Sequence, residues 1–257
     1  MSETSTGGSI QSVLNALRIL ERVGTDQPVG VSRLARDVGL PKTSVQRALN
    51  TLADAGWLRP VGGDLTRWEL TSRMLGIALH AFGEFSLRDH ADSAMDELRR
   101  RTGETIHLVA LDEDCGIVVH RLDSSQAVRA FVQVGTRSPL HATASGQAIL
   151  AFQPKARSKE IVSGTLETYT DRTVTDAAAI LDRLAAVRER GYAVNVAEWR
   201  PEVASISAPI LSRDGTAVAA MTISIPLSRY RDDLVETYGG WARELAQSLG
   251  PVSAERR

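Results

Sequence analysis

The sequence lacks the features of a membrane-spanning, secreted or disulfide-stabilised protein. It has one cysteine, Cys115, among 257 residues, so neither an internal disulfide nor a four-cysteine zinc site can form. No apolar run approaches the roughly 18 residues that a membrane-spanning helix needs. The polar start of the chain, residues 1–8, has no basic region followed by an apolar core and is not typical of a signal peptide. These absences predict a cytoplasmic protein.

An overall charge is also missing. The chain has 30 lysine and arginine residues and 31 aspartate and glutamate residues, which gives a net charge of −1. No global field therefore draws the protein to nucleic acid or to membranes, and DNA binding requires a local basic patch. Hydrophobic residues make up 43% of the chain and charged residues 24%, the composition of an ordinary folded protein.

What is present begins with the pattern of a winged helix-turn-helix. Apolar residues recur at helical spacing in three short segments, and two strand-like runs flank a Gly62-Gly63 turn. The predicted elements are helices over 10–23, 31–38 and 42–55 and strands over 57–59 and 66–70. Only three residues, Gly39 to Pro41, separate the second helix from the third, a short turn typical of this motif. The pattern predicts a DNA-binding domain over residues 1–71.

The third predicted helix has an apolar stripe and an opposite polar face that fits base and phosphate recognition. Arginine pairs with guanine, and glutamine and asparagine pair with adenine. The hydroxyl groups of serine and threonine can bond to either base. Two arginines on the wing can contact phosphates or a minor groove. The predicted DNA-binding residues are Lys42, Thr43, Ser44, Gln46, Arg47, Asn50, Arg59 and Arg67. A polar helix face can also be merely solvated, but residues 28–75 carry seven basic and four acidic residues, a local charge of +3.

The remainder of the chain predicts an α+β domain over residues 88–257. Its strand-like runs are 105–111, 116–121, 128–134, 192–195, 205–210 and 217–225, and its helix-like runs are 88–102, 142–152, 177–190 and 232–249. Turn sequences at 112–114 and 213–215 favour paired antiparallel strands with flanking helices. A linker helix is predicted over 72–87. It is apolar over a wide arc from Met74 to Phe82, so we expect it to need a partner surface, such as a second copy on a second half-site.

Small and hydroxyl-bearing residues in this domain predict a ligand pocket. Residues 142–146 are small and precede an apolar helix, where an anionic ligand can approach backbone amides. Thr222 and Ser224 alternate on one strand, so both hydroxyls face the same side, and Ser205 comes from a neighbouring strand. A few hydroxyls among apolar walls are typical of a small-molecule site.

Several segments resemble the IclR family of bacterial transcription regulators. In the first domain they are residues 31–49 and 52–58, and in the second 140–150, 191–195, 205–210 and 219–226. They follow one another in order, so the resemblance covers nearly the whole chain. It implies a GAF-like effector-binding domain, a palindromic double-stranded operator, a homodimer or homotetramer, no cofactor, and a small organic acid or aromatic compound as effector.

The resemblance also implies which residues contact the effector. They are Ala127, Ala130, Ala144, Ser145, Gly146, Asn195, Ser205, Thr222 and Ser224. Asn195 stands where the family usually has an acidic residue, and Gln147 where it usually has lysine. Both departures point to an effector with a different charge or hydrogen-bonding pattern, so no effector identity can be transferred.

Other functions remain to be weighed against a ligand-responsive regulator. A hydrolase using Ser145 is disfavoured because Ala144-Ser145-Gly146 lacks the Gly-x-Ser-x-Gly elbow. A DNA-binding protein without a ligand would have a filled second core. Three of the five histidines, His107, His120 and His141, could suggest a metal site but lack the spacing of metal ligands, so no metal site is predicted. The sequence leaves open whether Trp199 covers a pocket or lies on the surface.

Overall fold

A computed structural model of the protein describes residues 9–63, 65–82 and 87–252, without the side chains of residues 78–82. The chain forms two compact units, Met1–Glu84 and Phe85–Arg257, each with its own hydrophobic core. The predicted linker helix over 72–87 corresponds to α4, Arg73–Phe82, and the helix predicted over 88–102 to α5, Leu87–Thr102, while residues 83–86 lie outside the described part. No helix in the described part is long and apolar enough to cross a membrane.

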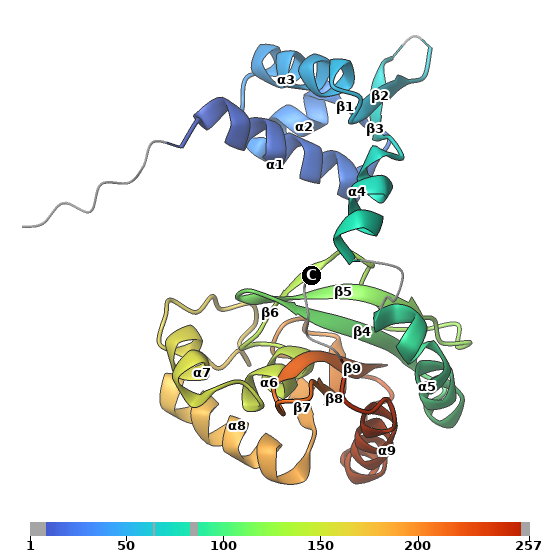
Figure 1. Ribbon diagram of the computed structural model, residues 1–257, viewed down its shortest axis with the longest axis vertical. Helices are drawn as coiled ribbons and strands as arrows, with labels where there is room; N and C mark the ends of the chain where they lie inside the picture. Colours follow the sequence, from blue (N-terminus) through green and yellow to red (C-terminus); the bar gives the residue numbers. More distant parts are fainter. Residues whose placement is uncertain (1–8, 64, 83–86, 253–257) are drawn as a thin grey trace, which may run out of the picture. The chain divides into compact units, whose positions relative to one another are not determined.

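The first unit consists of helices with a small three-stranded sheet at one side (Figure 1). Its elements are α1 (Gln11–Asp26), β1 (Val29–Gly30), α2 (Val31–Val38), α3 (Lys42–Asp54), β2 (Leu58–Val61), β3 (Arg67–Leu70) and α4 (Arg73–Phe82). The sheet has the order β1-β3-β2, and all its pairs are antiparallel. The three predicted helices and the two-stranded wing are thus confirmed, and β1 is an additional strand that pairs with the wing.

The turn between α2 and α3 depends on a glycine in a left-handed conformation. Gly39 follows α2 with φ +68° and donates its amide to the Ala35 carbonyl. A residue with a Cβ would be strained there, whereas glycine adopts this conformation readily and ends the helix. The chain then enters α3 after Pro41, so Leu34 of α2 and Val45 and Leu49 of α3 all reach one fully buried core.

Only the second half of α1 belongs to that core. Ile19, Leu20 and Val23 are buried. The apolar residues of the first half remain exposed, with Ile10 at 66% and Leu17 at 48% of their full exposure, together with Val13 and Leu14. The apolar face predicted from helical spacing exists, but the first unit by itself covers only part of it.

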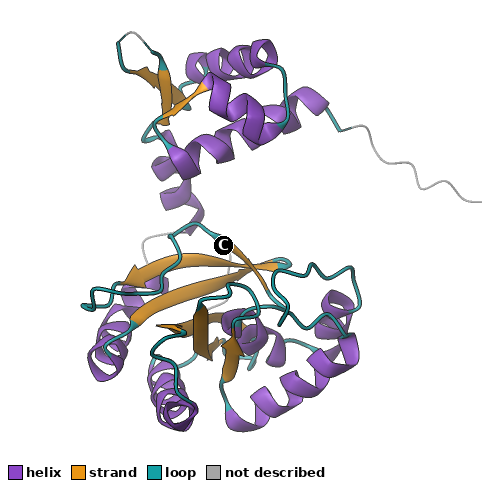
Figure 2. Ribbon diagram, turned by 180° about the vertical axis from the view of Figure 1, so that it is seen from behind, coloured by secondary structure: helices purple, strands orange, loops and turns teal. Residues whose placement is uncertain are grey.

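The second unit is built on a six-stranded antiparallel sheet with the order β6-β5-β4-β9-β8-β7. Figure 2 shows the sheet with helices packed around it. The strands are β4 (Thr105–Asp112), β5 (Cys115–Leu122), β6 (Arg137–Pro139), β7 (Ala193–Val196), β8 (Val203–Leu211) and β9 (Ala217–Pro226). The helices are α5 (Leu87–Thr102), α6 (Ala144–Ala151), α7 (Lys155–Val162), α8 (Ala177–Arg190), the 3-10 turn η1 (Asp232–Leu234) and α9 (Val235–Ser248). The α+β prediction is confirmed.

The two faces of this sheet have different partners, as the alternation of side chains along a strand requires. One face carries Ile106, Met221 and Ile223, which pack against α5 and α9. The opposite face carries Ala220, which packs with α6 and α8 in a second cluster. His107 on β4 and Thr222 and Ser224 on β9 alternate with the residues of the first face. Their polar side chains therefore lie on the α6 side of the sheet.

The prediction of a strand over residues 128–134 is wrong. This segment is a loop, because side chains take over its backbone hydrogen bonds: Arg229 donates to the Val128 carbonyl at 2.7 Å, and the Val132 amide donates to His107 Nε2 at 2.9 Å. Residues 137–139 instead form the short edge strand β6 on β5. Helix α7, at residues 155–162, was not predicted from the sequence.

Candidate functional site

Helix α3 presents its polar face to solvent. Lys42, Thr43, Ser44, Arg47 and Asn50 are exposed, and Gln46 is half-buried. Gln46 Nε2 donates to Asn50 Oδ1 at 2.9 Å, which aligns two amide groups able to read a base edge. In the described part of the chain the Arg47 guanidinium has no hydrogen-bonding or ionic partner, so its donors are available to a ligand.

The beginning of α3 offers unused backbone donors. Pro41 precedes the helix, no side chain caps it, and the first helical bond runs from the Val45 amide to the Pro41 carbonyl at 3.1 Å. The amides of residues 42–44 therefore have no intrahelical acceptor. An exposed helix N-terminus of this kind binds phosphate through its amides and its positive dipole end.

The two wing arginines differ in their surroundings. Arg59 forms an ion pair with Glu69 at 2.5 Å across the hairpin. Arg67 lies on β3, is exposed, and has no acidic partner among the described side chains. The positive charge of Arg67 is therefore not balanced by a described acidic side chain, whereas the charge of Arg59 is partly balanced.

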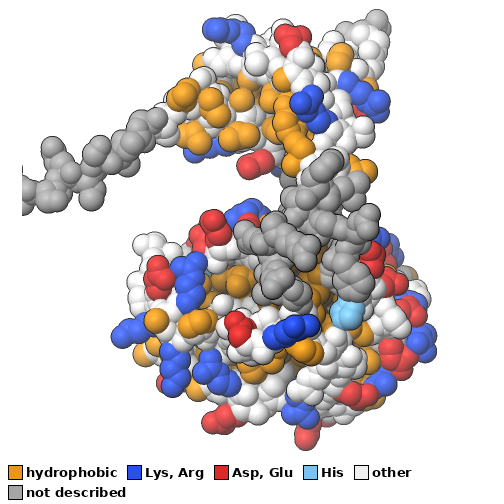
Figure 3. Space-filling view, in the orientation of Figure 1, with side chains coloured by type: hydrophobic (Ala, Val, Ile, Leu, Met, Phe, Trp, Pro, Cys, Tyr) orange, Lys and Arg blue, Asp and Glu red, His pale blue; other side chains and the backbone are white. Residues whose placement is uncertain are grey.

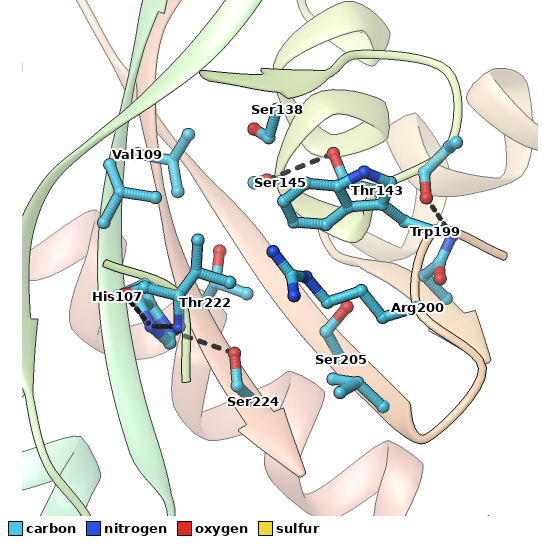
Figure 4. Close-up of a pocket in the computed structure, with 15 residues that line it drawn as sticks. His107, Val109, Ser138, Thr143, Ser145, Trp199, Arg200, Ser205, Thr222 and Ser224 are labelled. Carbon is cyan, nitrogen blue, oxygen red and sulfur yellow. Dashed lines mark hydrogen bonds between the residues drawn. The ribbon is translucent and has the colours of Figure 1, made fainter. Parts of the chain in front are cut away.

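The predicted ligand pocket exists as a narrow cavity of about 50 Å³ between the sheet and the beginning of α6. Five of the predicted effector residues line it: Ser145, Asn195, Ser205, Thr222 and Ser224. Figure 4 shows these hydroxyls converging from three directions: Ser145 from α6, Ser205 from β8, and Thr222 and Ser224 from β9. Ser205 and Ser224 are direct neighbours across the β8–β9 ladder.

His107 determines how Ser224 is hydrogen-bonded. The Val132 amide donates to His107 Nε2 at 2.9 Å, and the Val132 carbonyl oxygen lies 3.2 Å from the same nitrogen. Because an amide N–H can only donate, a proton on Nε2 would face the amide hydrogen, so Nε2 is the acceptor and the ring proton of the neutral imidazole is on Nδ1. His107 Nδ1 lies 2.9 Å from Ser224 Oγ and donates to it. Burial, aided by Arg121, lowers the pKa of His107 to about 4 and keeps the ring neutral. The hydroxyl proton of Ser224 therefore remains available to a ligand.

Thr222 is oriented in a similar way by a serine on the next strand. Ser207 Oγ donates to the Met221 carbonyl at 3.1 Å and lies 2.7 Å from Thr222 Oγ1. Since the Ser207 proton is directed to the carbonyl, Thr222 donates to Ser207 and keeps its oxygen lone pairs for the cavity. The pocket floor thus offers one donor, Ser224, beside one acceptor, Thr222.

The beginning of α6 faces the cavity. Thr143 caps the helix: its Oγ1 accepts from the Gly146 amide at 3.1 Å and donates to the Pro139 carbonyl at 2.7 Å. Ser145 Oγ donates to Thr143 Oγ1 at 3.3 Å. The first intrahelical bond runs from the Gln147 amide to the Thr143 carbonyl at 3.0 Å, so the amides of Ala144 and Ser145 have no intrahelical acceptor and can donate to an oxygen atom of a ligand.

Asn195 supports the pocket as well as lining it. Its Nδ2 donates to the Ala142 carbonyl at 3.1 Å, and its Oδ1 accepts from the Glu198 amide at 3.3 Å. An ionised acid at this position could not donate to Ala142. Asparagine therefore ties β7 to the segment before α6.

Gln147 and Glu198 are buried behind the residues that line the pocket. Gln147 Nε2 donates to the His141 carbonyl at 2.9 Å, and Glu198 Oε1 forms an ion pair with Arg183 Nη1 at 2.8 Å. Glu198 Oε2 is buried without a hydrogen-bond partner in the described part of the chain. Burial raises the pKa of Glu198, and Arg183 and Gln147 oppose that shift.

Four predicted effector residues do not line this cavity. Ala144 is fully buried in the cluster of α6 and α8, and Gly146 lies against Leu140, where a Cβ would come within 2.3 Å of the Leu140 backbone. Ala130 lines an open hollow beside the pocket, and Ala127 lines neither. These residues shape the walls or the surroundings instead of presenting side chains to the cavity.

Several lining residues were missed from the sequence. His107, Ser138 and Arg200 contribute polar groups, and Val109 and Val118 contribute apolar walls. Alternation on the predicted strand over 105–111 would have placed His107 and Val109 on one face, but nothing in the sequence identified that face as the pocket side. Trp199, left undecided, also lines the cavity, half-buried beside Arg200 (Figure 4).

The histidines have separate partners. His120 Nε2 lies 2.8 Å from Asp92 Oδ1, and His141 Nε2 lies 3.0 Å from the Glu167 carbonyl oxygen. Across the described ranges, no three potential metal ligands among histidine, cysteine and acidic residues gather in one place. Within the same ranges, the hydroxyl of Ser145 bonds to Thr143 and not to a histidine, so it lacks an activating base.

Comparison with known proteins confirms the resemblance. Residues 79–250 match the C-terminal domain of the bacterial transcriptional regulator IclR, and residues 12–62 match the IclR helix-turn-helix domain. The chain belongs to the IclR family. This membership makes it a DNA-binding transcriptional regulator with an effector-binding C-terminal domain, in a family of regulators and not of enzymes.

Relatives and solved structures of the IclR family match over nearly their full length. The chain is 32% identical to the HTH-type transcriptional regulator KdgR of Escherichia coli, covering 94% of both chains. It is 33% identical to the glycerol operon regulatory protein of Streptomyces griseus, covering 96% of this chain and 94% of that one. An IclR homolog of Microbacterium hydrocarbonoxydans, solved in complex with 4-hydroxybenzoate, superposes with a TM-score of 0.75 at 27% identity, covering 93% and 97%.

Proposed function

We propose that this IclR-family chain is a cytoplasmic regulator that binds a palindromic operator and changes its operator affinity when a small organic acid or aromatic effector occupies the pocket of the second unit. Residues 1–71 are assigned to DNA binding, 72–87 to the link, and 88–257 to effector binding. The observation that carries the proposal is the pocket: Ser145, Thr222 and Ser224 converge on one cavity of a domain whose relative binds 4-hydroxybenzoate.

On DNA, we assign base reading to α3 and phosphate contacts to its N-terminus and the wing. Gln46, Arg47 and Asn50 lie on the exposed face, and Arg67 has no acidic partner among the described residues. Lys42, Thr43 and Ser44 contribute side chains and amides at the start of the helix. Arg59 contributes less because Glu69 pairs with it.

The active form is proposed to be a homodimer, with a tetramer as a further assembly. One short recognition helix reads few bases, and two copies on related half-sites multiply the affinity. Ile10, Val13, Leu14 and Leu17 form an exposed apolar row on α1, visible as the orange patch over α1 in Figure 3. Met74, Leu75 and Ile77 of α4 are also exposed, so a second copy has apolar surface to cover.

The first test is sequence-specific DNA binding by the full-length protein. Fluorescence anisotropy at fixed salt compares DNA from upstream of the gene with an unrelated duplex. We expect a preference on the order of a thousandfold for the operator. Equal, salt-sensitive binding to both duplexes, and to further genomic fragments with added metabolites, would contradict the proposal.

The second test is ligand binding, with 4-hydroxybenzoate as the first probe because a relative of the same fold binds it. A ligand that binds only the folded protein stabilises it by RT ln(1 + [L]/Kd), so a thermal shift reports occupancy. The same compound is then added to the operator complex. A compound that shifts the melting temperature but leaves operator affinity unchanged would argue against control of DNA binding through the pocket.

A further inference from the structure

The pocket contains one charged side chain. Of the residues that line it, only Arg200 carries a formal charge, since burial keeps His107 neutral, and no acidic residue is among them. Glu198 is next to Arg200 in sequence, but its carboxylate pairs with Arg183 of α8. Arg200 is therefore the one formally charged group among the residues that line this cavity.

The guanidinium of Arg200 has no partner of its own. It stacks over the Trp199 ring at 4.6 Å, and within the described residues it forms no hydrogen bond or ion pair. Glu202 lines the neighbouring hollow together with Arg200 but forms no ion pair with it in the described part of the chain. Figure 4 shows the guanidinium extended into the cavity between Ser224 and Trp199, with its five N–H donors unused.

The loop that carries Arg200 is held in place from several sides. Ala197 has φ +61°, and its amide donates to the Val203 carbonyl at 2.9 Å, while the Val203 amide donates to the Arg200 carbonyl at 3.2 Å. Thr170 Oγ1 donates to the Ala197 carbonyl at 2.7 Å, and Thr173 Oγ1 donates to the Glu198 carbonyl at 2.5 Å. These contacts fix the backbone of the turn, and the exposed Arg200 side chain lies where the cavity meets the neighbouring hollow.

Donors also face the cavity from the opposite walls. Ser224 is 6% exposed, and its hydroxyl proton is free because His107 donates to its oxygen. The first amides of α6 are the donors on the α6 side, because the Ser145 hydroxyl already donates to Thr143. A ligand between these groups and Arg200 thus meets donors at both ends, which favours a molecule with oxygen acceptors at both ends.

We propose that Arg200 determines effector specificity: its guanidinium binds a carboxylate of the effector, while the Ser224 hydroxyl and the first amides of α6 bind oxygen atoms at the effector's other end. The planar, two-pronged fork of arginine matches a carboxylate, and the Trp199 ring holds that fork in one orientation. The proposal rests on the effector-binding role of the pocket and specifies which chemical group is read there.

The experiment compares acids with their own primary amides, which have nearly the same shape but no charge. The full-length protein is titrated with benzoate and benzamide, succinate and succinamide, and lactate and lactamide, and affinity is taken from thermal shift. We expect at least one acid to bind about tenfold or more tighter than its amide, as loss of a charge-assisted bond implies. The preference should disappear in R200M, persist in part in R200K, and remain in R213M, whose arginine is exposed on the β8–β9 turn.

Each other outcome overturns the assignment of Arg200. It is wrong if acids and amides bind equally, if R200M keeps the preference while its melting temperature without ligand matches the wild type, or if no acid of the panel binds. Operator binding is measured in parallel on the same samples. If the wild type shows no sequence-specific DNA binding, the proposed function itself is refuted. If it binds its operator but shows no preference for acids, only the role of Arg200 is refuted.

Discussion

Ser224 is a buried hydroxyl whose proton is kept free by its neighbour, and removing it tests the pocket. In Ser224→Ala we expect effector binding to weaken by about 1–2 kcal/mol, because the bond from the Ser224 hydroxyl to the effector is lost. His107 Nδ1 also loses its acceptor. Effector affinity by thermal shift and operator affinity by anisotropy are measured on the same preparation. Operator binding without effector should be unchanged.

The matched control for Ser224→Ala is Ser163→Ala, an exposed serine at the end of α7. It removes the same atom far from the cavity lining and should leave both affinities unchanged. If Ser224→Ala lost operator binding together with effector binding, the substitution would have disturbed folding. An unaltered effector response would instead remove Ser224 from the site.

His107 predicts a pH dependence with a definite sign. Its pKa is about 4 in the folded protein, below the 6.5 of a free imidazole, because burial disfavours the charged ring. The unfolded chain binds more protons between these values, so the stabilisation is complete above pH 6.5 and is lost as the pH falls toward 4. The difference corresponds to at most about 3 kcal/mol. Urea unfolding between pH 7 and pH 4, of the wild type and of His107→Gln, measures it.

The variant isolates His107 from the carboxylates that also titrate in acid. The free energy of unfolding of the wild type should fall more steeply with decreasing pH than that of His107→Gln. Parallel curves would show that the imidazole is not buried as a neutral acceptor of the Val132 amide. Ser224 would then no longer be held as a free donor.

At the scale of elements, the position of α6 depends on one glycine. A Cβ at Gly146 would lie 2.3 Å from the backbone of Leu140, so Gly146→Ala must push the helix away from the preceding segment. Overpacking of this kind costs about 1–3 kcal/mol. We expect a lower free energy of unfolding in urea and weaker effector binding, because the helix start that faces the cavity moves.

Gly240→Ala is the control for that change. Gly240 lies in α9, and a Cβ added there would meet no atom within 4 Å. Alanine should therefore raise the free energy of unfolding by about 0.5–1 kcal/mol through its helix propensity. Opposite signs for the two substitutions would attribute the effect to the contact with Leu140. Equal effects would mean that α6 does not pack against residue 140 as closely as described.

The recognition helix is tested by Arg47→Ala. The side chain is exposed and has no partner in the described part of the chain, so its removal should not destabilise the first unit. If Arg47 reads a base, operator binding weakens by about 1–3 kcal/mol and discrimination at one base pair relaxes. Anisotropy at fixed salt with single-base operator variants measures both. Arg213→Ala, with an exposed arginine in the second unit, should change neither.

Most elements were predictable from local pattern. Helical spacing with glycine and proline boundaries located α2, α3 and α8 closely, since amphipathic periodicity and end signals are properties of neighbouring residues. The segment 128–134 has alternation typical of a strand yet forms a loop. Its backbone partners, His107 and Arg229, are distant in sequence, so no local pattern contained that outcome.

At the scale of the whole molecule, the exposed row on α1 predicts self-association. Leu17→Glu places a charge where a second copy would bury an apolar side chain, so we expect dimers to dissociate into monomers by analytical ultracentrifugation. Operator affinity should fall with the loss of the second half-site. Ser12→Glu adds the same charge to α1 at an exposed polar position and should leave the dimer intact. A dimer that survives Leu17→Glu would place the interface elsewhere.

The sequence alone determined the two-domain regulator, the recognition helix and five of the residues that line the pocket. These follow from periodicity, turn chemistry and alternation, which depend on residues close together in the chain, and from segments that resemble one family. The tertiary structure decided what surrounds them. Packing brings Arg200 and His107 to the cavity from segments about 90 residues apart, buries Ala144 and Gly146 in the wall, and leaves half of α1 uncovered. Such long-range contacts depend on how the sheet and helices stack, which no local pattern of residues records.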